Sequence, residues 1–132
     1  MACFAGFLTG REAAKYMVPQ KRGTIIFTGA TASIRGAANF SAFSVGKSGL
    51  RALSQSMARE LGPDGVHVAH IVIDGAVDTA WIRKNFSHLI SKMPADGIIQ
   101  PDDIAENYWN IAQQPRCAWT HELDIRPYCE HF

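Results

Sequence analysis

The stretch that decides the fold is GTIIFTG, at residues 23–29. The five residues between the two glycines are all β-branched or aromatic, and none of them is charged. Such side chains favour a β-strand, and a run without alternating charged positions is typical of a strand buried on both faces of a parallel sheet. We therefore expect a buried strand over residues 24–28, and the remaining elements can be placed outward from it.

A helix and a second strand follow this stretch. Apolar residues recur at helical spacing between residues 41 and 61, and a Gly-Pro pair then ends the helix. The next apolar run, at residues 66–73, predicts a second buried strand that stops at an Asp-Gly pair. A helix between two such strands predicts parallel pairing through a right-handed crossover.

Three outer elements complete the expected order. Residues 1–18 form a helical pattern that Pro19 ends, and a third helix is expected from Pro101 to about Gln114. Apolar and polar residues alternate over 118–125, which predicts a half-exposed last strand. The order α-β-α-β-α-β therefore predicts an α/β fold with a parallel sheet.

Composition narrows the class of protein. With 132 residues, 47% apolar and 19% charged, the chain is expected to form one globular domain. A formal net charge of +1 gives no reason to expect nucleic acid, and no apolar run is long enough to span a membrane. An odd number of cysteines without metal-ligand spacing predicts free thiols, and hence a cytoplasmic protein.

The segment FSVGK, at residues 43–47, holds the most informative pair of side chains. Phe43 and Lys47 are four residues apart on an expected helix, so they share one face. In its strand–loop–helix context this segment resembles the Tyr-x-x-x-Lys signature of the short-chain dehydrogenase/reductase family. The resemblance implies that Lys47 holds the nicotinamide ribose, and that Phe43 occupies the position of the tyrosine that transfers a proton.

Two further catalytic positions of the family differ here. Counting back thirteen residues from Phe43, the family's serine position is Ala30, and its asparagine position aligns near Ala2. Of the four positions, only Lys47 keeps the family's side chain. The resemblance therefore implies a lineage that abandoned the usual proton transfer, or one that performs it with other groups.

The segment DGAVDT, at residues 74–79, resembles the family's Pro-Gly-x-Val-x-Thr motif. The resemblance implies that Gly75, Val77 and Thr79 face an NAD or NADP cofactor, with Asp74 in place of the proline. An alternative for Thr79 is an ordinary helix cap. Lys47 likewise could be a solvated lysine on an amphipathic helix.

The resemblance runs from residue 1 to about residue 125, but it covers only the C-terminal half of the family's domain. No Gly-x-x-x-Gly-x-Gly turn occurs in the sequence. Residues 1–132 are therefore expected to form a single partial domain, half of a Rossmann-like doubly wound sheet without its dinucleotide-binding half. The implied ancestral reaction is NAD(P)-dependent hydride transfer between a small alcohol and a carbonyl, weak or absent in this chain alone.

The alternative function is a non-catalytic remnant, or pseudoenzyme, that acts through its helices. The resemblance implies a homo-oligomer through helices 1–18 and 41–61, and the second of these is rich in small residues that allow close helix packing. No metal site is expected, because His67 and His70 lie on opposite faces of a strand. Hydroxyl groups near the missing serine and tyrosine could replace them, although hydrogen bonds in loops and helix caps are the simpler explanation of these groups.

Overall fold

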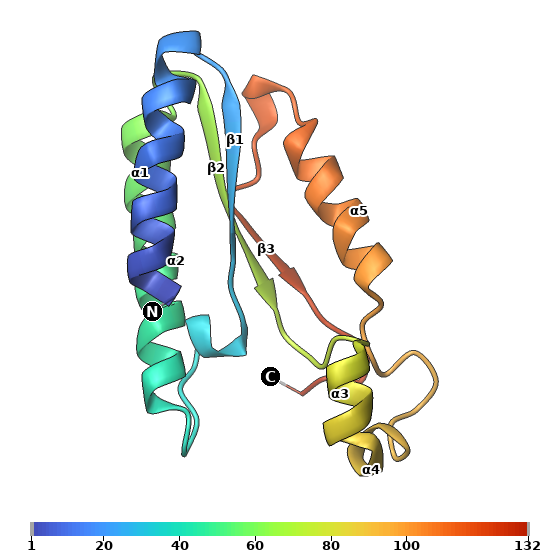
Figure 1. Ribbon diagram of the computed structural model, residues 1–132. Helices are drawn as coiled ribbons and strands as arrows, with labels where there is room; N and C mark the ends of the chain where they lie inside the picture. Colours follow the sequence, from blue (N-terminus) through green and yellow to red (C-terminus); the bar gives the residue numbers. More distant parts are fainter. Residues whose placement is uncertain (1, 132) are drawn as a thin grey trace.

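The computed structural model describes residues 2–131, and within them three parallel strands form one sheet with helices on both faces (Figure 1). This architecture confirms the α/β class and its parallel sheet. The long elements are α1 (Ala2–Gln20), β1 (Gly23–Thr28), α2 (Ser41–Leu61), β2 (Val66–Ile73), α5 (Pro101–Ala112) and β3 (Glu122–Ile125). The short helical elements are η1 (Thr31–Ser33), α3 (Ala80–Asn85), α4 (Ser87–Ile90) and η2 (Arg116–Ala118).

The strand order β1-β2-β3 places β2 in the middle of the sheet. All six residues of β1 pair with β2, from Gly23 opposite Val66 to Thr28 opposite Ile71. The four residues of β3 pair with the second half of β2. The central strand is buried at seven of its eight positions, as its continuous apolar run predicts.

Helices α1 and α2 cover one face of the sheet, and α5 lies on the other face (Figure 1). The core under α1 and α2 is formed by buried residues of both helical and strand origin: Ile25, Phe27, Leu50, Met57, Val66 and Val68. A smaller core under α5 contains Ala69, Ile71 and Ile111. Each such side chain contributes roughly 1.5–3 kcal/mol when it is fully buried, so the larger core holds the two-helix layer in place.

The carboxyl ends of the three strands point toward the same end of the molecule (Figure 1). The segment after β1, the segment containing α3 and α4, and the C-terminal segment gather at this end. In a parallel α/β sheet, ligands bind at this edge. No helix among the described residues is both long and apolar enough to cross a membrane.

Two predicted boundaries are wrong. The first helix passes through Pro19 and ends at Gln20, so the proline removes one N–H donor in the last turn, one residue before the helix ends. The last strand begins at Glu122 instead of residue 118, since the Gln114 side chain accepts the Thr120 N–H and donates to the Thr120 hydroxyl. That side chain holds residue 120 beside the end of α5, and residues 116–118 form the short helix η2 instead of a strand.

Candidate active site

Lys47 and Phe43 form the part of the site that α2 presents to the end of β1. The Lys47 ammonium donates a 2.8 Å hydrogen bond to the Thr28 carbonyl and lies 5.8 Å from the centroid of the Phe43 ring. The two side chains therefore share a face, as their spacing predicts. Burial lowers the pKa of Lys47, because the charged form loses part of its hydration.

Phe43 presents an apolar ring where a phenol could exchange a proton. Its ring is 47% exposed and meets the Phe40 ring edge-on, with 6.5 Å between the centroids. A phenyl group at this place can bind apolar substrate atoms and stabilise the Lys47 cation, but it has no proton to transfer.

Ala30 follows β1 and begins the short η1 turn. Its N–H donates to the Ser33 hydroxyl at 3.0 Å, so the buried Ser33 side chain serves the backbone of the turn. Ser44 lies beside Phe43 on α2, and its hydroxyl oxygen is buried without a hydrogen-bond partner among residues 2–131. The Ser33 hydroxyl is bonded within the turn and the Ser44 hydroxyl is shielded, so neither is presented to solvent.

Asp74 is the most buried charged group at the strand ends, with 0% exposure. The Thr31 hydroxyl donates to its Oδ1 at 2.5 Å, and guanidinium groups of Arg35 and Arg126 each lie 3.5 Å from its carboxylate oxygens. Asp74 thus links the turn after β1 to the C-terminal segment. This role was missed by the sequence analysis, although a carboxylate directly after a fully buried strand was an available signal.

The predicted cofactor-facing residues Gly75, Val77 and Thr79 follow Asp74. Gly75 has a φ of +155°, and an added Cβ would lie 2.7 Å from Pro127, so only glycine fits there. Val77 pairs with Ile99 in an isolated parallel bridge. The Thr79 hydroxyl accepts the Ile82 N–H at 3.2 Å and caps α3, which is the alternative that the sequence left open.

The short helices α3 and α4 follow this segment, and aromatic residues lie on α3 and at its end. The Trp81 and Phe86 rings lie 5.5 Å apart, and Ile82 and Phe86 line a small apolar cavity of about 170 Å³. Trp81 itself is mostly exposed. These side chains therefore form an apolar cluster next to the strand ends.

A second polar cluster, of which only His70 is fully buried, lies between α2 and the sheet. His70 contacts Glu122 at 3.0 Å through Nδ1, and Arg51 donates two 2.7 Å hydrogen bonds to the same carboxylate. Burial lowers the pKa of His70, while the Arg51 hydrogen bond lowers the pKa of Glu122. Gly29 is required above this histidine, because an added Cβ would lie 2.3 Å from Nε2.

His67 lies on the other face of β2 and stacks on Trp119, with ring centroids 4.8 Å apart. Its Nε2 lies 2.8 Å from the Thr120 carbonyl. Both β2 histidines therefore have structural contacts. No group of three or more metal-binding side chains occurs within residues 2–131.

Tyr108 on α5 is a phenol close to the end of β1. Its hydroxyl lies 2.7 Å from the Thr28 hydroxyl, and burial raises its pKa. Lys47 reaches the carbonyl of the same Thr28 from α2, on the opposite face of the sheet (Figure 1). Tyr108 therefore does not occupy the position that Phe43 leaves without a proton donor.

Comparison with known proteins places these features in a family. A family model described as short chain dehydrogenase matches residues 1–89. The chain is 29% identical over 111 residues to the short-chain dehydrogenase/reductase homolog YusR of Bacillus subtilis, covering 82% of this chain and 84% of that protein. It is 43% identical over 81 residues to the short-chain dehydrogenase/reductase eriH of Hericium erinaceus, covering 61% of this chain and 32% of that protein.

Solved structures agree with this match. A short-chain dehydrogenase from Rhodopseudomonas palustris is 47% identical and superposes with a TM-score of 0.75, covering 97% of this chain and 49% of that one. A 4-hydroxyisoleucine dehydrogenase complexed with NADH is 24% identical, with a TM-score of 0.79 and coverage of 94% and 54%, which shows the shared fold. This chain thus spans about half the length of the solved relatives. Its strands, helices and family match together show that the chain belongs to the short-chain dehydrogenase family of oxidoreductases.

Proposed function

We propose that this chain carries the lysine-bearing half of a nicotinamide-dependent alcohol/carbonyl oxidoreductase site whose proton donor has been lost. Turnover by the chain alone is accordingly weak or nil. The observation that carries the proposal is the Lys47 ammonium, which lies at the end of β1 above a phenyl ring instead of beside a phenol.

Carbonyl reduction needs a hydride and a proton, and the two come from different groups. A bound nicotinamide cofactor supplies the hydride. In the proposed ancestral site the residue at position 43 supplied the proton, and an adjacent ammonium stabilised its deprotonated form. With Phe43 in place, Lys47 retains the role of holding a ribose hydroxyl and loses the role of lowering a phenol pKa.

The residues present fit one end of such a cofactor. Lys47 is half-buried with donor hydrogens at the strand end, and Thr79 is an exposed hydroxyl beyond the same edge of the sheet. Gly75 and Val77 complete the proposed nicotinamide-facing set, with Gly75 allowing close approach of the backbone. The sequence holds no glycine-rich turn for a pyrophosphate, so most of the binding energy of a dinucleotide is not available from residues 1–132.

Calorimetric titration with NADH and with NADPH tests this proposal. Because only one end of the cofactor is held, we expect a Kd no tighter than about 1 mM, which corresponds to roughly −4 kcal/mol. A micromolar Kd for either cofactor would contradict the proposal.

A second candidate function is a non-catalytic protein that acts through its helical layer. Several apolar side chains on α1 and at the start of α2 are exposed, among them Phe4, Phe7 and Val45. Large exposed apolar patches are typical of interfaces, so we include a homo-oligomer through α1 and α2 in the proposal. The three unpaired cysteines support a reducing, cytoplasmic location.

Sedimentation velocity distinguishes the second candidate. Self-association at tens of micromolar that Val45→Glu abolishes supports an interface on α2. A sharp monomer boundary for the unmodified chain over that range would contradict it.

A further inference from the structure

The Arg35 side chain is exposed at the strand ends and is only loosely held there. Its guanidinium lies 3.5 Å from the Asp74 carboxylate and 3.8 Å from the Glu130 carboxylate, and it donates a 3.1 Å hydrogen bond to the His131 carbonyl. A charge-assisted hydrogen bond between a guanidinium and a carboxylate is typically about 2.8 Å long. Both carboxylate contacts of Arg35 are longer than this, so neither is a close hydrogen bond.

Arg51 shows how a fully engaged guanidinium binds a carboxylate in the same molecule. Its Nε and Nη2 donate 2.7 Å hydrogen bonds to the two oxygens of Glu122. This forked pairing is the geometry in which a guanidinium recognises a carboxylate or a phosphate. Arg35 has the same donors at an exposed position, so an anionic ligand can pair with it as Glu122 pairs with Arg51.

The turn after β1 carries Arg35 toward the end of β2. The Arg35 N–H donates to the Thr31 carbonyl at 3.0 Å, so Arg35 continues the turn that begins at Ala30. The Thr31 hydroxyl donates to Asp74, the residue before Gly75. Arg35 therefore lies next to the segment that the proposed function assigns to the nicotinamide.

The same turn also lies close to the start of α2. A Cβ added to Gly36, the residue after Arg35, would lie 3.8 Å from the Ser44 hydroxyl. Ser44 directly follows Phe43, the position that the proposed function assigns to proton transfer. Arg35 thus lies between that position and the nicotinamide-facing segment, where a substrate would bind.

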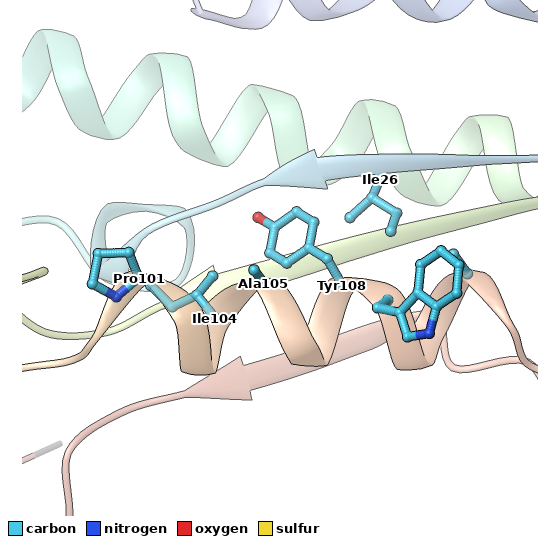
Figure 2. A pocket seen from close by; sticks show the side chains of 7 residues that line it. Ile26, Pro101, Ile104, Ala105 and Tyr108 are labelled. Atoms are coloured by element: carbon cyan, nitrogen blue, oxygen red, sulfur yellow. The ribbon is translucent and has the colours of Figure 1, made fainter.

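Two apolar cavities of the molecule offer a ligand no such cation. A groove of about 540 Å³ between β1 and α5 is lined by apolar groups and by Tyr108, whose hydroxyl already contacts Thr28 (Figure 2). The cavity of about 170 Å³ beside α3 and α4 has an apolar lining. Neither lining contains a charged side chain, so neither can hold an anionic group as Arg35 can.

We propose that Arg35 binds an anionic group of the substrate, which is a small carbonyl or alcohol compound bearing a carboxylate or a phosphate. The ligand replaces Glu130, because the Glu130 carboxylate is partly exposed and lies 3.8 Å from Arg35, whereas Asp74 is fully buried. The inference rests on the proposed function, since it names the substrate class of that site.

NMR titration of the unmodified chain, followed at the Arg35 Nε–H and the Gly36 amide, tests the proposal. The probes are pyruvate for a carboxylate, dihydroxyacetone phosphate for a phosphate, and acetone as a neutral carbonyl compound. We expect a saturable shift with at least one of the two anions and none with acetone, and the anion that responds identifies the group. A saturable shift with acetone as well, or with none of the three probes, would overturn the proposal.

Substitutions then assign the binding to Arg35. Arg35→Gln should weaken binding of the responding anion at least about tenfold, since the forked pair is lost. Arg35→Lys keeps the charge beside Asp74 and should weaken it less. Glu130→Gln removes the competing carboxylate and should tighten binding about threefold. Arg59→Gln is the matched control, because Arg59 is also exposed and donates to a backbone carbonyl, that of Gln55; its affinity should be unchanged.

Unchanged affinity in both Arg35 variants would overturn the proposal, as would an equal loss in Arg59→Gln. Unchanged affinity in Glu130→Gln would overturn the assignment of Glu130 as the group that the ligand replaces. These titrations need no cofactor, so the two proposals fail separately. Micromolar binding of NADH would contradict the proposed function and leave anion binding at Arg35 in place, whereas absence of anion binding would leave the role of Lys47 in place.

Discussion

Two regions near the carboxyl ends of the strands differ in the polar side chains that they contain. In the interior, Asp74 is held by a hydroxyl and two guanidinium groups, and Glu122 joins Arg51 to His70. At the proposed catalytic positions, Phe43 and Ala30 carry no polar side-chain atom, and Lys47 bonds to a backbone carbonyl. Under the proposed function, the chain thus contains the polar groups that stabilise the fold and lacks those that would transfer protons.

The largest effect is expected from restoring the catalytic positions. In a longer relative that carries the same phenylalanine and alanine, Phe43→Tyr with Ala30→Ser should raise carbonyl reduction by at least about 10²-fold, the lower end of general acid–base assistance. Nicotinamide absorbance with a small ketone measures the rate. Phe43→Leu is the control. An unchanged rate in the double variant would contradict the proposal that positions 43 and 30 lack the groups needed for proton transfer. In this chain alone, no measurable gain is expected.

The interior region should respond in stability. Asp74→Ala removes a fully buried carboxylate together with its contacts to Thr31, Arg35 and Arg126, while the two guanidinium groups keep Glu130 and Asp124 as partners. We expect a cost of about 2 kcal/mol in the free energy of unfolding. Urea unfolding measures this cost. The exposed Asp64→Ala is the matched control, expected to change stability by less than about 0.5 kcal/mol. A loss from Asp74→Ala no larger than that of the control would show that the interior network is not stabilising.

His70 should make stability depend on pH. Its pKa is lowered in the folded state, so the unfolded chain binds the proton more tightly than the folded one. The contribution of neutral His70 to the free energy of unfolding is complete above the unfolded-state pKa of about 6.5. It is lost as the pH falls below that value, at no more than about 1.4 kcal/mol per pH unit. Glu122, Arg51 and His121 also act on this ring, and the lowered pKa of Glu122 places its own effect at more acidic pH.

Urea unfolding at pH 7.5 and at pH 5.5 tests the histidine. The unmodified chain should be less stable at pH 5.5, and His70→Gln should reduce that difference. Equal pH dependence in both proteins would exclude His70 as its source.

The smallest effect is expected at Lys47. Lys47→Met removes one hydrogen bond to the Thr28 carbonyl and keeps much of the side chain's length, so the free energy of unfolding should change by less than about 1 kcal/mol. A loss comparable to that of Asp74→Ala would place Lys47 among the stabilising groups and remove the contrast between the two regions.

Much of the fold could be predicted because its signals are local. The continuous apolar runs locate β1 and β2, and the helical spacing over residues 41–61 gives α2 its observed bounds. The last strand was predicted too long, because residues 116–118 form a short helix and the side chain of Gln114, six residues away, binds Thr120 at its backbone N–H and its hydroxyl. Periodicity contains no information on such a contact.

The candidate site was predictable only where residues are neighbours on one element. Phe43 and Lys47 share a helix face and meet as expected. Asp74 with Arg35 and Arg126, and His70 with Glu122 and Arg51, join residues from different elements. These partners are brought together by the strand register, so they could not be identified before the sheet was known.

Turnover by an unmodified longer relative with phenylalanine and alanine at positions 43 and 30 tests the central claim most directly. The substrate is a small alcohol or ketone with NAD(H) or NADP(H), followed by nicotinamide absorbance. The lost proton donor predicts a rate far below the roughly 1–10³ s⁻¹ that is typical of enzymes. A rate within that range would show that another group supplies the proton and that Phe43 does not disable the site.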